Sequence, residues 1–196
     1  NKIEGFTQNI EKKQTEHIYD KFYAEVYDQL FLSDLKNEYE CVQLQKNYIK
    51  TWSGNTIRVL DLGCGTGHHL RILNRYGHHV EGLDQCKYML KKAKINCPKA
   101  ILKQGNFDNP KTYLRNQFTH ILCLFYTVYY SKNIILLLQN INDWLAPNGI
   151  MVLHVVDRKK FDPVLERASS LIPLFDPQRH NKNRSTSTIL EFKEFK

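Results

Sequence analysis

The chain has 196 residues, of which 42% are hydrophobic and 24% are charged, a composition typical of one folded domain and unlike a disordered or fibrous chain. Its longest apolar runs, such as residues 121–130, are much shorter than the roughly 18 to 20 residues that cross a bilayer. The first residues also lack the pattern of a signal peptide. We therefore expect a cytoplasmic protein with no membrane partner.

Basic residues outnumber acidic ones by 28 to 20, which gives a net charge of +8. Such an excess makes nucleic acid a candidate partner. Six lysines and no acid lie between residues 85 and 107, but they are not interleaved with aromatic residues as in a nucleic-acid groove, so a solvated face is the simpler interpretation. The five cysteines form no C-x-x-C pair, which argues against a disulfide framework and a zinc ribbon and favours a reducing compartment.

Apolar residues at helical spacing predict two helices at the N-terminus. The first covers residues 15–30 and carries a stripe of tyrosines that includes Tyr19 and Tyr27. The second starts at Ser33, a candidate N-cap, and continues to residue 52 with Leu35, Tyr39, Val42 and Ile49 along one stripe.

Five short apolar runs then predict buried strands at residues 57–62, 79–83, 100–104, 119–124 and 150–156. Helix-like stretches separate them, the clearest being residues 134–145, which a turn at residues 147–149 ends. This alternation predicts an α/β fold with a doubly wound, mostly parallel sheet and helices on both faces.

The C-terminal tail is less regular than the rest of the chain. It predicts a helix at residues 161–171, a loop at 174–187 and one more strand at 188–195, where the sequence stops. Because the chain also begins with Asn, we expect a processed chain or a fragment, with a sheet truncated at its C-terminal edge.

A glycine-rich loop follows the first predicted strand and precedes a helix. Glycines at positions 63, 65 and 67 let the main chain turn tightly and lie against a ligand where a Cβ would collide. A dinucleotide site would need its third glycine at position 68, where the chain has His68. Asp61 would repel a pyrophosphate but suits a ligand with an ammonium group, so we expect a cationic ligand.

The motif Asp-Leu-Gly-Cys-Gly-Thr-Gly at residues 61–67 resembles the first motif of class I S-adenosylmethionine-dependent methyltransferases, and the resemblance extends over residues 57–157. It implies a Rossmann-like fold and S-adenosyl-L-methionine as the cofactor. In that reading residues 1–54 form helices that cover the cofactor cleft, and residues 55–196 form the methyltransferase core of one overall domain.

The resemblance also implies roles for individual side chains. Asp84, at the end of the second strand, would accept hydrogen bonds from both ribose hydroxyls; an N-cap role for the helix that begins near Lys87 is the alternative, and the two roles are compatible. Met89 would pack on the adenine, Asn106 would accept from its amino group where the family usually has Asp, and the Phe107 N–H would donate to the ring. The expected cofactor-binding residues are Tyr19, Tyr27, Asp61, Gly63, Cys64, Gly65, Gly67, Asp84, Gln85, Met89, Asn106, Phe107 and Leu124.

The acceptor pocket is expected beyond the fourth strand. Its candidate residues are aromatic and comprise Phe125, Tyr126, Tyr129 and Tyr130. As a general base, His154 is a weaker candidate than Asp157, because it lies mid-strand and fits a buried core histidine. Thr119 stands where relatives commonly have Asp, with little expected effect on the cofactor. The paired histidines at 68–69 and 78–79 lack the spacing of a metal site.

The predicted function is methyl transfer by in-line displacement, with a small metabolite as the acceptor. One alternative is an RNA methyltransferase, suggested by the net charge, although the chain lacks an Asn-Pro-Pro-Tyr-type motif after the fourth strand. The other is a non-catalytic module that binds the cofactor, suggested by the departures at Asn106 and Thr119. The sequence identifies neither the acceptor atom, nor a catalytic residue, nor the oligomeric state.

Overall fold

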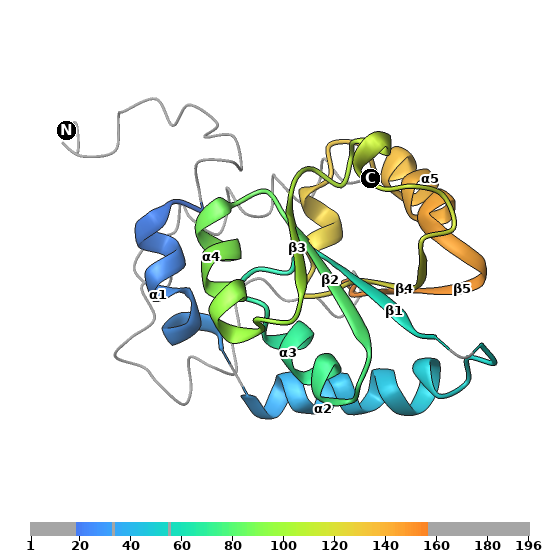
Figure 1. Ribbon diagram of the computed structural model, residues 1–196. Coiled ribbons are helices and arrows are strands. Elements are labelled where there is room, and N and C mark those ends of the chain that lie inside the picture. Colours follow the sequence, from blue (N-terminus) through green and yellow to red (C-terminus); the bar gives the residue numbers. More distant parts are fainter. Residues whose placement is uncertain (1–18, 33, 55, 157–196) are drawn as a thin grey trace. The chain divides into compact units, whose positions relative to one another are not determined.

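The computed structural model describes residues 19–32, 34–54 and 56–156 (Figure 1). The chain divides into two compact units, residues 1–154 and residues 155–196, and almost all of the second unit lies outside the described residues. The helix, loop and strand predicted after residue 160, as well as Asp157 and the candidate N-cap Ser33, therefore lie outside the described residues.

The first unit is built on a five-stranded parallel sheet with the strand order β3-β2-β1-β4-β5 (Figure 1). The strands are β1 Arg58–Leu62, β2 His79–Asp84, β3 Ile101–Gln104, β4 Phe118–Cys123 and β5 Leu145–Leu153. The parallel sheet that the apolar runs predict is confirmed. Because β1 is central and all strands run the same way, the glycine loop after β1 lies at the middle of the carboxyl edge.

Helices cover both faces of this sheet, as predicted. Cys41, Leu44 and Ile49 pack with Leu70 and Leu73 on one face, in a core cluster that also contains strand residues. The helical segments involved are α2 Asp34–Leu44, its π-helical continuation η2 Gln45–Ile49, α3 His68–Arg75 and α4 Lys87–Asn96.

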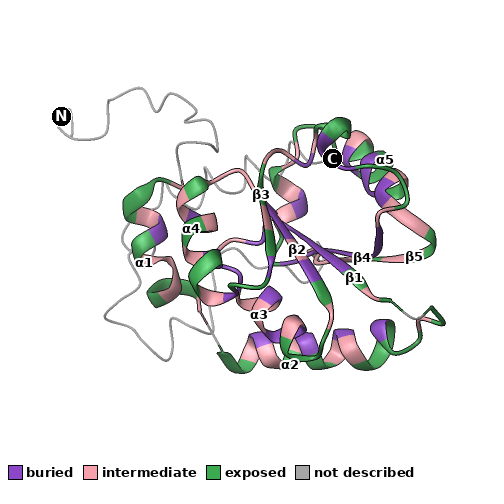
Figure 2. Ribbon diagram, viewed as in Figure 1, coloured by how far each residue is buried: buried purple, intermediate pink, exposed green. Residues whose placement is uncertain are grey.

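The opposite face of the sheet is covered by α5 Ile134–Trp144. Leu137, Ile141 and Trp144 of this helix join Leu60 and Phe118 of the strands in a second core cluster. The buried residues concentrate in the strands between these layers (Figure 2). Two short 3-10 segments, η3 Pro110–Thr112 and η4 Thr127–Tyr130, complete the elements.

The first helix begins later than its sequence pattern predicts. It is α1 Lys21–Phe31, and the Asp20 side chain caps it by accepting a hydrogen bond from the Tyr23 N–H at 2.8 Å. A short polar side chain of this kind stabilises a helix start, because it satisfies one of the free N–H groups of the first turn.

The second helix is present, but it buries a different face from the predicted one. Leu35 and Tyr39 are 87% and 66% exposed, whereas Asn37, Cys41 and Leu44 are buried. The inner face of α2 is the one that carries Cys41 and Leu44, which pack on Leu70 and Leu73 of α3, while ion pairs such as Arg71–Asp34 lie at its border. The helical period was sufficient to predict the helix but not its orientation.

The last strand differs from its prediction in length. β5 starts at Leu145, five residues before the predicted start, and pairs with β4 through an irregularity between Leu145 and Ile150. The predicted turn at residues 147–149 is thus a bulge within β5, where Asn148 has a left-handed φ of 62°.

Candidate functional site

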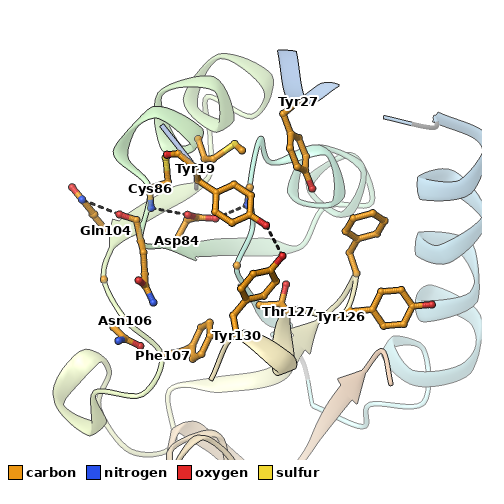
Figure 3. Close-up of a pocket in the computed structure, with 16 residues that line it drawn as sticks. Tyr19, Tyr27, Asp84, Cys86, Gln104, Asn106, Phe107, Tyr126, Thr127 and Tyr130 are labelled. Atoms are coloured by element: carbon orange, nitrogen blue, oxygen red, sulfur yellow. Dashed lines mark hydrogen bonds between the residues drawn. The ribbon is translucent and has the colours of Figure 1, made fainter. Parts of the chain in front are cut away.

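A cavity of about 810 Å³ opens at the carboxyl ends of the strands (Figure 3). It contains most of the residues that the sequence assigned to a cofactor site, which are Tyr19, Tyr27, Gly63, Gly65, Asp84, Gln85, Met89, Asn106 and Phe107. Cys86, Gln104 and Thr127 line it as well and were not singled out in the sequence. Gln104 ends β3, and Cys86 and Thr127 lie in the segments that follow β2 and β4, so their positions after predicted strands were the signal that could have found them.

Asp84 links the glycine loop to the start of α4 (Figure 3). One carboxylate oxygen accepts from the Gly65 N–H at 2.9 Å and the other from the Cys86 N–H at 2.8 Å. The alternative N-cap role is wrong, because Cys86 holds the N-cap position of α4. Burial raises the pKa of Asp84, and the two backbone hydrogen bonds oppose that rise. Each oxygen keeps a further lone pair, so the carboxylate can accept from a diol in the cavity.

The glycines of the loop do not all face ligand space. Gly65 has φ +51°, and a Cβ placed on it would have no other atom within 4 Å. Gly67 has φ +80° and lines neither cavity, and a Cβ on it would lie 2.9 Å from the Cβ of Ala93 in α4. Gly65 therefore leaves room for a ligand, whereas Gly67 allows α4 to approach the loop closely.

A second cavity of about 70 Å³ shares Tyr27, Gly63 and Gly65 with the larger one. Its wall includes Asp61, Cys64 and Leu124, the remaining predicted residues apart from Gly67.

Asp61 is only 3% exposed, and it lines the smaller cavity. Burial raises its pKa to about 6, while the charge of His69 lowers it and the charges of Asp84 and Glu40 raise it. A buried carboxylate is costly unless it is paired, so a cationic donor that enters this cavity would be bound favourably.

The opposite end of the larger cavity carries Asn106 and Phe107 after β3. The Asn106 amide oxygen accepts a hydrogen bond from the Asp108 N–H at 2.7 Å and so closes a local turn. A hydrogen bond from a ligand would be the second one that this oxygen accepts. Phe107 is buried, and its carbonyl accepts from the Asn140 side chain at 2.9 Å. Met89, in α4, is also buried and lines the same cavity.

Tyr19, which precedes α1, and Tyr130 of η4 face each other at the cavity (Figure 3). The Tyr19 hydroxyl donates to the Tyr130 hydroxyl at 2.7 Å, and the Tyr19 carbonyl accepts from the Cys86 thiol at 2.8 Å. Burial raises the pKa of Tyr27 to about 12 and raises that of Tyr19 as well, so both phenols stay neutral at physiological pH. Tyr126 also lines this cavity, whereas Tyr129 lines neither cavity.

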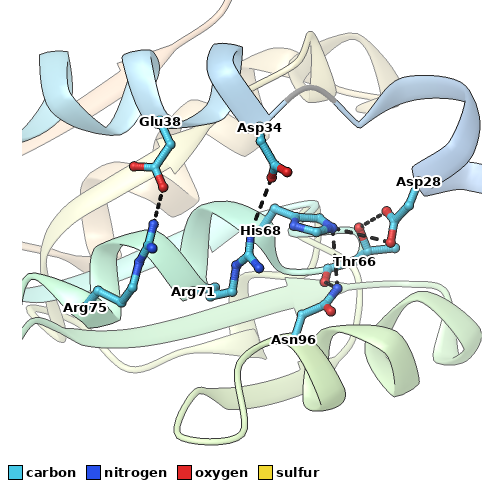
Figure 4. Close-up of polar contacts among 8 residues, drawn as sticks. All are labelled: Asp28, Asp34, Glu38, Thr66, His68, Arg71, Arg75 and Asn96. Atoms are coloured by element: carbon cyan, nitrogen blue, oxygen red, sulfur yellow. Dashed lines mark hydrogen bonds and ion pairs between the residues drawn. The ribbon is translucent and has the colours of Figure 1, made fainter.

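Polar contacts hold α1 against the glycine loop (Figure 4). The Asp28 carboxylate accepts from the Thr66 hydroxyl at 2.6 Å and lies 3.3 Å from His68 Nε2. The Asn96 side chain of α4 donates to the Thr66 carbonyl at 2.8 Å. The sequence offered only a weak signal for this cluster, namely that Asp28 adjoins Tyr27 and that Thr66 lies within the glycine motif.

The segment after β4 has an unusual backbone. Phe125 and Tyr126 are consecutive non-glycine residues with φ 49° and 62°, a conformation that costs about 1 to 3 kcal/mol per residue. The Phe125 N–H donates to Nδ1 of His154 at 3.0 Å. His154 itself lines neither cavity, so the structure gives it no direct place as a general base.

Neither a metal-binding cluster nor a helix able to cross a membrane occurs among the described residues. In that part of the chain no cluster of three or more His, Cys, Asp or Glu side chains has the arrangement of a metal site. Likewise, none of the helices there is long and apolar enough to cross a bilayer.

Comparison with known proteins identifies the family. A family model described as a methyltransferase domain matches residues 16–191, so the chain belongs to this methyltransferase family. The resemblance stated from the glycine motif is thereby confirmed.

Among curated proteins, the chain is 26% identical over 140 residues to the dTDP-3-amino-3,4,6-trideoxy-alpha-D-glucopyranose N,N-dimethyltransferase of Streptomyces venezuelae, covering 70% of this chain and 58% of that protein.

Two solved structures are similar in both sequence and fold. One is the S-adenosylmethionine-bound CalS10 of Micromonospora echinaspora, an amino pentose methyltransferase, with 27% identity, a TM-score of 0.58 and coverage of 74% of this chain and 60% of that one. The other is DesVI of Streptomyces venezuelae, with 25% identity, a TM-score of 0.61 and coverage of 71% and 60%. The chain thus spans about three fifths of the length of these relatives.

Proposed function

We propose that this chain binds S-adenosyl-L-methionine and transfers its methyl group to a small-molecule acceptor. The observation that carries the proposal is the pair of buried carboxylates beside the glycine loop, because Asp61 lines one cavity and Asp84 lines the other. The two are joined by the main chain of Gly63 and Gly65, which lines both cavities. A ligand with an ammonium group at one end and a ribose further along matches this order of groups.

The cofactor fits the residues that are present. Asp61 would hold the ammonium group and Asp84 the ribose diol, with Gln85 beside it. Asn106, Phe107 and Met89 would bind the adenine, while the buried Cys64 and Leu124 would form the wall at the amino-acid end. When bound, S-adenosylmethionine supplies a methyl group already activated by its sulfonium.

The residues of this chain would then act by positioning and by excluding water. Tyr19, Tyr27 and Tyr130 line the larger cavity, and the buried phenols of Tyr19 and Tyr27 are neutral because their pKa values are raised. An apolar, water-poor pocket favours a displacement in which positive charge disperses, and holding the reactants close supplies about 7 to 11 kcal/mol. We further propose that residues 1–54 act as the cover of this site and residues 55–196 as the core.

The acceptor is proposed to be a small molecule because relatives named as methyltransferases of an aminodeoxy sugar nucleotide and of an amino pentose match most of the chain. RNA as an acceptor is suggested only by the net charge of +8. A cytoplasmic location is proposed from the five cysteines, all of which are free thiols.

Calorimetry with S-adenosylmethionine and S-adenosylhomocysteine tests this proposal, with NAD as the control ligand. Both sulfur compounds should bind to the unmodified chain. Asp84→Ala should lower the affinity for both by about tenfold or more, because two hydrogen bonds to the ribose are lost. The matched control is Asp143→Ala, which removes an exposed carboxylate on α5. Absence of binding by the unmodified chain would overturn the proposal.

A screen of amino sugars and other small acceptors for release of S-adenosylhomocysteine then tests the transfer itself. Release that depends on a small acceptor supports the proposal. RNA binding that falls steeply with added salt, together with release that depends on RNA, would instead support the RNA alternative.

A further inference from the structure

We propose that His154 is a positioning residue, whose Nδ1 lone pair holds the Phe125–Tyr126 turn in the conformation that shapes the larger cavity. This inference deepens the proposed function, because the turn forms a wall of the proposed methyl-transfer site. His154 lies at the end of the first compact unit; its main chain contacts the last residue of β4, and its ring contacts the turn that follows β4.

The turn needs an external partner. Phe125 and Tyr126 both adopt the left-handed conformation, which non-glycine residues keep only when their surroundings enforce it. The main-chain N–H of His154 donates to the Cys123 carbonyl at 3.0 Å, which fixes the histidine next to the end of β4. Its ring then accepts from the Phe125 N–H at 3.0 Å, the first residue of the turn.

This hydrogen bond specifies a single protonation state of the ring. A ring nitrogen can accept a hydrogen bond only when it carries no proton, so Nδ1 must be bare and the proton must sit on Nε2. Nε2 lies 4.0 Å from a carboxylate oxygen of Glu40 in α2. If Nδ1 were protonated, two N–H donors would face each other. The hydrogen bond to the Phe125 N–H would then be lost, and the turn would no longer be held.

The charged groups around the ring come from two helices. Glu40 accepts from His69 of α3 at 2.8 Å and from Lys36 of α2 at 3.0 Å. Burial by itself would raise the pKa of the Glu40 carboxyl, but these two hydrogen bonds outweigh it and lower the pKa to about 2. The same Lys36 ammonium lies 5.0 Å from the centre of the Phe125 ring, so this charged group also contacts the turn.

These neighbours favour the required neutral ring. Burial lowers the pKa of His154, Lys36 and His69 lower it further, and Glu40 opposes them. The ring is therefore neutral at physiological pH, and acid conditions would protonate it and weaken its hold on the turn.

Two substitutions test this role, because they place a side-chain amide at different distances from the backbone. In His154→Asn the amide oxygen lies where Nδ1 lies and can accept from the Phe125 N–H without titrating. In His154→Gln the amide lies near the position of Nε2 and leaves Phe125 without its partner. By calorimetry at pH 7.5, His154→Asn should bind S-adenosylhomocysteine within about threefold of the unmodified chain, and His154→Gln about tenfold more weakly.

The pH dependence of the affinity for S-adenosylhomocysteine distinguishes this role from a merely structural one, which would leave that dependence unchanged. Between pH 8.0 and 5.5 the unmodified chain should lose more affinity for S-adenosylhomocysteine than His154→Asn does. Asp61 and Asp84 also titrate with raised pKa values, but they are present in both proteins, so the difference between the two profiles isolates His154. Parallel profiles, or equal affinities of the Asn and Gln variants, would overturn the inference.

Nitrogen-15 spectra of the histidine rings test the tautomer in the unmodified full chain, with His154→Asn identifying the signal. We expect a bare Nδ1 and a protonated Nε2 at pH 7.5. A proton on Nδ1 at that pH would sink the inference even if the cofactor binds. Conversely, the expected tautomer in a chain that binds no S-adenosylhomocysteine would leave the inference about the turn standing and remove the proposed function.

Discussion

Asp61 is a carboxylate buried in the central strand, and burial raises its pKa from the ordinary 3.8 to about 6. A folded chain that binds this proton more tightly than the unfolded chain loses stability as the pH rises through that range. Asp61→Asn should therefore raise the free energy of unfolding at pH 7.5, by about 1 to 3 kcal/mol. The same change should lower the affinity for S-adenosylmethionine roughly tenfold, because the carboxylate that pairs with the ammonium group is lost.

Urea unfolding and calorimetry on the same preparations check both halves of this prediction. The matched control is Asp143→Asn, an exposed carboxylate paired with Arg115, which should alter neither quantity by much. A loss of stability in Asp61→Asn would mean that Asp61 has a structural partner that keeps it charged.

Gly65 and Gly67 allow a paired prediction, because both have positive φ but different surroundings. Gly65→Ala should cost about 1 to 2 kcal/mol of stability from backbone strain, and its methyl group would enter space that a ligand needs. Gly67→Ala adds a collision with Ala93 to the same strain and should lose about 2 to 4 kcal/mol.

Comparing the two variants separates ligand contact from packing. Gly65→Ala should remain folded with S-adenosylhomocysteine affinity reduced at least about tenfold. If Gly65→Ala binds as well as the unmodified chain, the loop does not lie against the ligand. Unfolding midpoints give the stability of each variant, and calorimetric titrations give its affinity for S-adenosylhomocysteine.

Individual site residues differed in how well the sequence revealed them. Asp84 and Asn106 could be predicted because each follows a strand, and strand ends converge at one edge of a parallel sheet. Glu40 and Thr66 could not be predicted, since their roles depend on how α2 and α1 sit against α3 and the glycine loop. No local pattern encodes that packing.

At the level of elements, α1 is a part of the site that few buried side chains hold in place. Ala24 is its one buried residue among those described, and Asp28 supplies its polar link to Thr66 and His68. Asp28→Ala should therefore let α1 separate from the glycine loop more often. Hydrogen exchange of the α1 amides should become about tenfold faster, while the strands keep their protection.

The control for this element is Glu25→Ala on the same helix. Glu25 forms an exposed ion pair with Lys21, which contributes little to stability, so exchange in α1 should change less than about twofold. Equal acceleration in the two variants would show that Asp28 does not anchor the helix.

The strands were predictable as elements and the N-terminal helices only in part. Buried parallel strands are short apolar runs, so their positions are visible in the sequence, although β5 starts earlier because a bulge interrupts its pairing. In α2 the apolar stripe of Leu35 and Tyr39 is exposed, because Cys41 and Leu44 form the face that packs on α3. Periodicity reports an apolar face but not what covers it.

For the whole molecule, the buried histidine His120 links folding to pH. It is fully buried in β4, between the Thr119 hydroxyl and the Tyr48 carbonyl. Burial lowers its pKa, and the hydrogen bond to Tyr48 opposes that change. The stability that the neutral ring contributes is complete above the unfolded pKa of about 6.5 and is lost as the pH falls through the folded value.

His120→Gln should remove this dependence while still donating to the Tyr48 carbonyl. Between pH 7.5 and 5.5 the unmodified chain should lose about 1 kcal/mol more unfolding free energy than the variant. Asp61 acts in the opposite direction, but equally in both proteins. His79→Gln changes an exposed position and should show the same pH dependence as the unmodified chain. Chemical unfolding at both pH values measures the free energy of unfolding of all three proteins.

The bond between the Tyr19 and Tyr130 hydroxyls joins residues 111 positions apart in the chain and spans the larger cavity. Breaking this bond widens the gap between the segment before α1 and η4. Tyr130→Phe removes one of the two hydroxyls, so we expect S-adenosylhomocysteine to dissociate faster from this variant than from the unmodified chain, and stopped-flow measurements of the dissociation rate check this.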